Sequence, residues 1–236
     1  MDKVTLDKRY DKILKEKINR RSRSKDPLKN ALDKIFDASD LLEIIHKKIK
    51  NRRLIQEARK QFVITSVTAM EVLLKDYFIK LLSNFEIMDK FPEYIEKKYS
   101  IEDLDYFEDK NISNEEIICN NYNFQNISQI NNAYSKALSL DAKNPNSFNF
   151  FNELKEYKWW YDKKDKRGYQ KLGEFYQKLD KVISLRHDFV HDINFRFRLN
   201  KDEVEDIDSF CVFFMSQLGF FMEDQIKRLK KEKIKI

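Results

Sequence analysis

Two of the chain's three histidines and an arginine lie within one eight-residue run, LRHDFVHD, which begins at residue 185. The run contains Arg186, His187, Asp188 and His191. A histidine with an ordinary pKa of about 6.5 can accept or donate a proton at neutral pH, and an arginine can bind two oxygens of a phosphate. These groups suit RNA cleavage without a metal, because the ribose 2′-OH is an internal nucleophile that needs only proton transfer and charge stabilisation.

The spacing of these residues limits how such a site could form. On a regular helix, Arg186 and His191 are about 140° apart, whereas His187 and His191 share one face. One helix therefore places Arg186 and His191 poorly around a single phosphate. Two copies that meet at a two-fold axis would pool both arginines and both histidines in one cleft, so a homodimer is expected.

A purely structural role for the same residues stays open. In that interpretation Arg186 pairs with Asp188 or Asp192, and the histidines are ordinary polar groups. Substitutions would then lower stability and leave RNA untouched, since breaking an ion pair that is shielded from water is costly.

Other kinds of site find little support in the sequence. Cys119 and Cys211 are the two cysteines, and with three histidines they are too few for a structural zinc site. Gly168 and Gly173 have the spacing of a phosphate loop, but the lysine and hydroxyl residue that should follow are missing. Neither a metal nor a cofactor is expected.

The composition indicates which fold must position these residues. The chain has 236 residues, of which 42% are hydrophobic and 36% charged, but only three glycines and three prolines. The hydrophobic fraction is sufficient for a sizeable core. Doubly wound sheets, hairpin sandwiches and glycine-loop nucleotide binders need more glycines. An all-α fold is therefore predicted.

The first two predicted helices lie before residue 85. Asp26 can cap a helix that has Pro27 at its first position. The segment 62–78 is almost uniformly apolar until Glu71, so it is predicted to form a central helix.

Four further helices are predicted after the central one. A capping box at residues 113–116 opens a short helix, and another short helix is expected within 145–160. Apolar residues recur at three- and four-residue spacing over 169–190, which predicts that the histidine run lies on a helix. Asn200, with Glu203 three residues later, opens the last helix.

These elements predict one helical domain over residues 1–236. Its core is expected from roughly 27–84 and 167–230, which form a helical bundle. A loop-rich helical insert, roughly 85–165, separates the central helix from the helix with the histidine run. The asparagine-rich segment 120–132 contributes to the loop-rich character of the insert.

Basic residues are unevenly distributed along the chain. The last eleven residues carry +5 of the net charge of +6. Such a tail attracts phosphates, although a solvated helix end is the simpler interpretation. A second basic cluster, residues 20–25, could join the tail in one patch. The weaker candidates for RNA contact are Arg20, Arg21 and Arg23 in this cluster and Lys227, Arg228, Lys230 and Lys231 in the tail.

A second weak candidate for RNA contact combines aromatic and basic residues. Trp159 and Trp160 stand close to Lys163 and Lys164, as on a surface that stacks single-stranded bases. The alternative is that these side chains belong to the core and its rim.

The histidine run resembles a known signature. RHDFVH at 186–191 resembles the Arg-polar-x3-His form of the RxxxxH motif of the HEPN superfamily, helical domains of many RNA-cleaving toxins and antiviral systems. AMEVLLKD at 69–76 looks like the earlier central helix of that superfamily, with its Glu-x3-Lys/Arg pattern. NFQN at 123–126, together with 130–138, is similar to the RiboL-PSP-HEPN branch. The resemblance covers roughly residues 55–225.

The resemblance implies a HEPN-like bundle, a homodimer with a composite cleft, and metal-independent endoribonuclease activity that leaves 2′,3′-cyclic phosphate and 5′-OH ends. Arg186 matches the family arginine and His191 the family histidine, which would be the catalytic pair. His187 occupies the polar position, where it would orient the phosphate or the catalytic groups, with Asp188 beside it. Some family toxins carry a tyrosine that an antitoxin modifies; here that position is Ile193, which argues against this mode of control.

Two further residues come from the central-helix resemblance. Glu71 and Lys75 form an i,i+4 pair, whose simplest role is helix support worth about 0.3–0.5 kcal/mol. If the bundle brings this helix against the histidine run, Glu71 would instead bind a histidine and Lys75 would contact RNA.

The predicted partners are an RNA substrate, a second copy of the chain, and an antitoxin or sensor that restrains the nuclease. The alternative function is a noncatalytic nucleotide- or RNA-binding module, or a subunit of a larger defence complex. No apolar run is long enough for a secretory signal or a membrane span, so a cytoplasmic protein without a membrane partner is expected.

Overall fold

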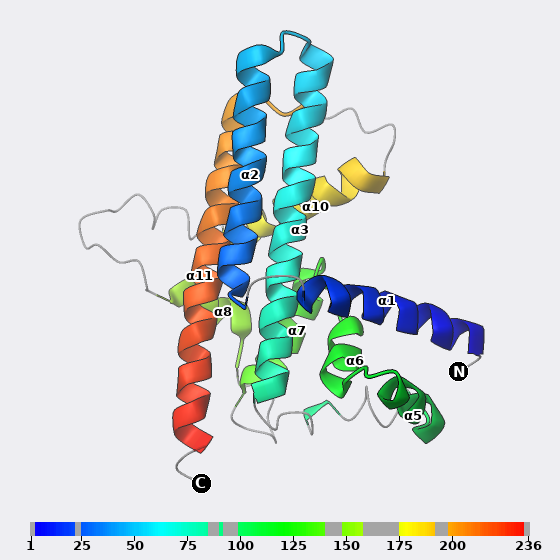
Figure 1. The fold of residues 1–236 in the computed structure, drawn as a ribbon. Helices are drawn as coiled ribbons and strands as arrows, with labels where there is room; N and C mark the ends of the chain where they lie inside the picture. Colours follow the sequence, from blue (N-terminus) through cyan, green and yellow to red (C-terminus); the bar gives the residue numbers. More distant parts are fainter. Residues whose placement is uncertain are drawn as a thin grey trace. The chain divides into compact units, whose positions relative to one another are not determined.

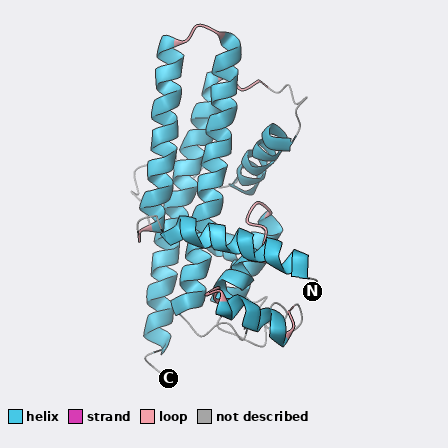
Figure 2. Ribbon diagram, turned by 45° about the vertical axis from the view of Figure 1, so that its right-hand side comes forward, coloured by secondary structure: helices cyan, strands magenta, loops and turns pink. Residues whose placement is uncertain are grey.

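The computed structural model describes residues 3–21, 25–84, 90–91, 99–139, 148–157, 175–191 and 198–233. These residues form nine helices and no strand (Figures 1 and 2). The all-α prediction is confirmed.

The chain divides into two compact units. Unit 1 comprises Met1–Lys25, Leu74–Phe151 and Gln225–Ile236, and unit 2 comprises Asp26–Leu73 and Asn152–Asp224. The long helices α3 (Arg52–Asn84) and α11 (Lys201–Lys233) contribute residues to both units. The single domain with an insert at roughly 85–165 stays a prediction.

Unit 2 contains α2 (Pro27–Lys48) and α10 (Phe175–His191), together with the first parts of α3 and α11 and most of α8 (Phe150–Glu156). Within this unit α2, α3 and α11 run side by side (Figures 1 and 2). Its core consists of the apolar faces of these three helices and of α10, with side chains such as Ile35, Val63, Leu179 and Phe214 at 1% exposure or less. Burying such faces is what holds helices of this composition together.

Local capping decides where two of these helices begin, as the sequence predicts. The Asp26 carboxylate accepts a hydrogen bond from the backbone N–H of Lys29 at 3.1 Å, and α2 follows. Before α11, Asn200 and Glu203 each accept a bond from the other's backbone N–H at 2.8 Å. These side chains bind backbone N–H groups that have no partner within the helix.

Unit 1 contains α1 (Lys3–Arg21), α5 (Ile101–Asp109), α6 (Asn114–Asn120) and α7 (Ile127–Leu138), with the ends of α3 and α11. The capping box that opens α6 is present as predicted. The asparagine-rich segment is more helical than the sequence suggested, because the side chain of Asn126 caps α7 by accepting a bond from the N–H of Gln129 at 2.9 Å.

Helix α1 was not anticipated from the sequence. A small apolar cluster explains its position within unit 1: Ile13 packs with Tyr99, Phe107, Ile112 and Ile117, all at 5% exposure or less. Since these residues come from α1, α5, α6 and the segments beside them, the cluster joins the N-terminal helix to the middle of the chain.

Candidate functional site

Helix α10 carries the predicted catalytic residues and is held in unit 2 by one buried face. Its buried residues are Phe175, Leu179, Val182 and Leu185. The ring of Phe175 packs against the ring of Phe214 on α11, with centroids 5.9 Å apart. This contact fixes which side of α10 faces the protein interior.

Two polar contacts add to this attachment. The Lys178 ammonium lies 2.5 Å from a carboxylate oxygen of Asp206 on α11. The ammonium of Lys60 on α3 lies 5.9 Å from the centre of the Phe189 ring, which is a cation–π contact. Helix α10 therefore contacts α3 and α11 through charged side chains, in addition to the contact of its buried face with α11.

The opposite face of α10 presents the two histidines. His187 and His191 are both exposed, and their ring centroids are 4.7 Å apart with the ring planes at 44°. The helical period predicts this pairing, because residues four apart lie one above the other on a helix surface.

Arg186 does not share this face. Its side chain is half-buried and its Nε atom is shielded from solvent, whereas His191 is exposed. Asp188 is also half-buried. The structure thus agrees with the divergence of Arg186 and His191 that their five-residue spacing implies.

Glu71 and Lys75, which match the central-helix pattern of the HEPN superfamily, belong to different units. Glu71 is half-buried and belongs to unit 2, as α10 does. Lys75 belongs to unit 1, where its ammonium lies 3.3 Å from a carboxylate oxygen of Glu16 on α1.

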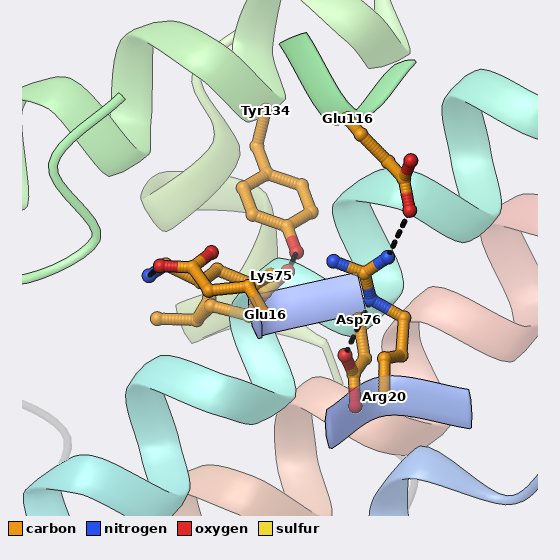
Figure 3. A network of polar contacts seen from close by, with 7 residues as sticks. Glu16, Arg20, Lys75, Asp76, Glu116 and Tyr134 are labelled. Atoms are coloured by element: carbon orange, nitrogen blue, oxygen red, sulfur yellow. Dashed lines mark hydrogen bonds and ion pairs between the residues drawn. The ribbon is translucent and has the colours of Figure 1, made fainter. Parts of the chain in front are cut away.

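Lys75 is part of a larger set of charged residues in unit 1, which we call the α1 charge network: Glu16, Lys17, Arg20, Lys75, Asp76 and Glu116. Figure 3 labels all of these residues except Lys17. Arg20 is its centre, with Nε 3.3 Å from Asp76 and Nη1 2.9 Å from Glu116. The ammonium of Lys17 lies 3.2 Å from the second oxygen of Glu116. Asp76 and Glu116 are 8% and 6% exposed. Arg20, a candidate for RNA contact, therefore binds two buried carboxylates of its own chain.

The C-terminal basic residues divide into two groups. Arg228 donates a hydrogen bond to the carbonyl of Leu138 at 3.2 Å, while Lys90 donates to the carbonyl of Ala137 at 3.2 Å. Both cations thus bind carbonyls at the C-terminal end of α7, where the helix dipole favours positive charge. Burial, and then the charge of Arg228, lowers the pKa of Lys90. The remaining candidates on α11 are exposed: Lys227, Lys230 and Lys231.

Other basic candidates cannot be placed in the same way. Arg21 ends α1. Arg23, Lys163 and Lys164 lie outside the described residues.

Sequence reasoning missed a cavity of about 220 Å³ in unit 2. It lies among α2, α3 and α11, and its lining includes Ser39, His46, Phe62 and Asp208. Ser39 donates a hydrogen bond to Asp208 at 3.1 Å, and burial raises the pKa of this carboxyl group. Since the lining residues come from three separate segments, no local pattern could have predicted the cavity.

His46, the third histidine, lies in a different environment from the α10 pair. Arg59 donates a hydrogen bond from Nε to Nε2 of His46 at 3.1 Å. Burial first, and then the charge of Arg59, lowers the pKa of His46. Arg59 also donates to the carbonyl of Leu199 at 2.6 Å, so the contact is part of the packing between α2, α3 and the segment that precedes α11.

A family model described as RiboL-PSP-HEPN matches residues 28–219, which is more than half of the chain. The chain belongs to the RiboL-PSP-HEPN family. This finding confirms the resemblance drawn from the RHDFVH run. The match of the RiboL-PSP-HEPN model includes α10 with Arg186 and His191, and begins after α1.

Membership of the RiboL-PSP-HEPN family indicates a nuclease or another RNA-related module. Comparisons with curated proteins and with solved structures found no match. In the described part of the chain, no helix is long and apolar enough to cross a membrane. The same residues contain no group of three or more histidine, cysteine or acidic side chains that could hold a metal ion.

Proposed function

We propose that this RiboL-PSP-HEPN protein is a metal-independent RNA endonuclease of the toxin or antiviral defence type. The observation that carries the proposal is the RHDFVH run on α10, a helix of the matched domain that presents His191 on its exposed face. A substrate as large as RNA can approach such a face without any change in the fold.

The proposed reaction is a transesterification at phosphorus. The ribose 2′-oxygen forms a bond to the phosphorus, the bond to the 5′-oxygen breaks, and the proton of the 2′-OH is removed while a proton is delivered to the leaving oxygen. His191 performs one of these proton transfers. The guanidinium of Arg186 stabilises the negative charge on the phosphate oxygens in the transition state. The products are a 2′,3′-cyclic phosphate and a 5′-OH.

A second copy of the chain completes the site in this proposal. Arg186 is half-buried and His191 is exposed on another side of α10, so one protomer aligns them poorly around one phosphate. In the proposed dimer, a two-fold axis beside α10 would bring Arg186 of one protomer next to His191 of its partner. His187, with its ring 4.7 Å from that of His191, would orient the phosphate or the catalytic histidine.

Other residues have supporting roles. The exposed lysines near the end of α11 would attract the RNA backbone and make binding weaker at high salt. Glu71 remains a candidate partner of a site histidine. An antitoxin or sensor would restrain a nuclease of this kind in the cytoplasm.

The test is to incubate the purified full-length chain with mixed cellular RNA in EDTA. The proposal predicts cleavage by the wild type and none by an Arg186→Ala/His191→Ala protein that folds normally. His46→Gln is the matched control, because it removes the one histidine outside the RHDFVH run, which lies on α2, and it should still cleave. Full cleavage by the double variant would refute the proposed roles. Intact RNA with every folded protein would favour the noncatalytic binding module.

A further inference from the structure

The paired histidines of α10 have a second chemical capacity besides proton transfer. We propose that His187 and His191 together form a binding site for a late first-row divalent cation such as Zn²⁺, and that an ion bound there switches off RNA cleavage. The inhibition of cleavage rests on the proposed function, whereas the cation site does not.

The geometry of the pair supports chelation. Imidazole nitrogen is a preferred ligand of Zn²⁺, with Zn–N distances of about 2.0–2.1 Å. Two histidines at positions i and i+4 of one helix are the arrangement with which helical zinc sites hold the ion. Here the two ring centroids are 4.7 Å apart, and the ring planes are inclined at 44°. Side-chain rotation alone can then bring one nitrogen of each ring to a common ion.

The surroundings of the pair also favour a hydrated cation. Both rings are exposed on the side of α10 that does not pack on α3 or α11. An ion with two protein ligands keeps water in its other positions, so it needs access to solvent rather than a closed cage. Neither ring has to leave the protein core, so binding an ion does not require α10 to lose any buried contact.

His46 provides an internal contrast. Its Nε2 already accepts a hydrogen bond from the Arg59 guanidinium at 3.1 Å. A cation approaching that nitrogen would meet a positive charge and would have to displace the bond. The α10 pair, not His46, is therefore the cation site.

Binding at the pair would interrupt the proposed reaction directly. A nitrogen lone pair that is bound to a metal cannot accept a proton, so His191 would lose its role while the ion is present. The nuclease itself needs no metal, which makes the cation an inhibitor. A chelator should restore cleavage completely.

The first experiment measures binding without reference to RNA. The full chain, free of any histidine tag, is titrated with ZnCl₂ in a calorimeter, together with His187→Gln, His191→Gln and the control His46→Gln. Both α10 positions are exposed, so glutamine is accommodated without loss of folding. Removal of a group that only hydrogen-bonds to a metal ligand already lowers metal affinity about 10- to 100-fold. Each α10 variant should thus bind Zn²⁺ at least about tenfold more weakly than the wild type, and His46→Gln should bind equally well. Equal binding by all four proteins would overturn the site.

The second experiment measures cleavage at the Zn²⁺ concentrations that fill the site. Wild-type cleavage should fall in proportion to occupancy and return after addition of EDTA. Cleavage that continues at full occupancy would overturn the inhibition while leaving the binding site intact. If Zn²⁺ binding depends on His187 and His191 but the protein never cleaves RNA, the proposed function is refuted and the cation site is supported. The two failures are therefore distinguishable.

Discussion

Gly219 on α11 lies against Leu28 on α2 so closely that a Cβ atom at position 219 would be 2.6 Å from one methyl carbon of Leu28. Gly219→Ala should therefore destabilise the protein by about 1 kcal/mol, because the cost of overpacking exceeds the gain in helix propensity. Urea denaturation would measure the change.

The same contact can be tested with a double-mutant cycle. Leu28→Ala removes the atoms that the new methyl group would meet. The cost of Gly219→Ala should then largely disappear in the Leu28→Ala background, where alanine becomes the better helix former. Strictly additive effects would show that the close approach does not exist.

Arg20 should be important for the stability of unit 1. Arg20→Ala leaves the buried carboxylates of Asp76 and Glu116 with less compensating charge, and breaking a buried pair in this way costs about 3–5 kcal/mol. Since Lys17 still contacts Glu116, the lower end of this range is expected in thermal or urea denaturation.

An exposed ion pair provides the control for Arg20. Lys29→Ala breaks the i,i+4 pair with Asp33, in which both side chains are more than half exposed. The expected cost is much smaller than that of Arg20→Ala, because solvent screens such pairs. If the two substitutions had equal effects, the α1 charge network would not stabilise the fold.

Asp208 should make stability depend on pH. Burial raises its pKa in the folded protein above the ordinary value of 3.8. The folded state therefore binds a proton more readily than the unfolded state, and stability increases as pH falls from the raised folded pKa towards 3.8. At neutral pH the charge of this half-buried carboxylate is a cost, so Asp208→Asn should stabilise the protein.

The pH profile separates this explanation from a general effect of the substitution. The advantage of Asp208→Asn should shrink in denaturation curves recorded below the folded pKa of Asp208. The hydrogen bond from Ser39 can be kept by the asparagine oxygen. An advantage that is constant over this range would contradict the assigned cause.

The sequence predicted those features that depend on neighbouring residues. The caps at Asp26, Ser113 and Asn200 were identified because each involves a side chain and a backbone N–H only three residues away. The common face of His187 and His191 follows from the helical period for the same reason.

Features that join distant segments could not be predicted in this way. Helix α1 is held by contacts such as that between Arg20 and Glu116, which are 96 residues apart. From the sequence, Arg20 was only a basic residue, for which RNA contact and a solvated helix end were the two interpretations; an ion pair with residues so far along the chain has no local signature. The cavity beside Asp208 is formed by three helices and has no local signature either.

Cleavage through the ribose 2′-OH can be tested with a synthetic RNA and the same RNA with 2′-O-methyl riboses, each incubated in EDTA with the wild type, Arg186→Ala and His191→Ala. The wild type should cleave only the unmodified RNA and leave 2′,3′-cyclic phosphate and 5′-OH ends, and each variant should lose at least about 100-fold in rate. Cleavage of the 2′-O-methyl RNA, or an unchanged rate in both variants, would contradict the proposed mechanism.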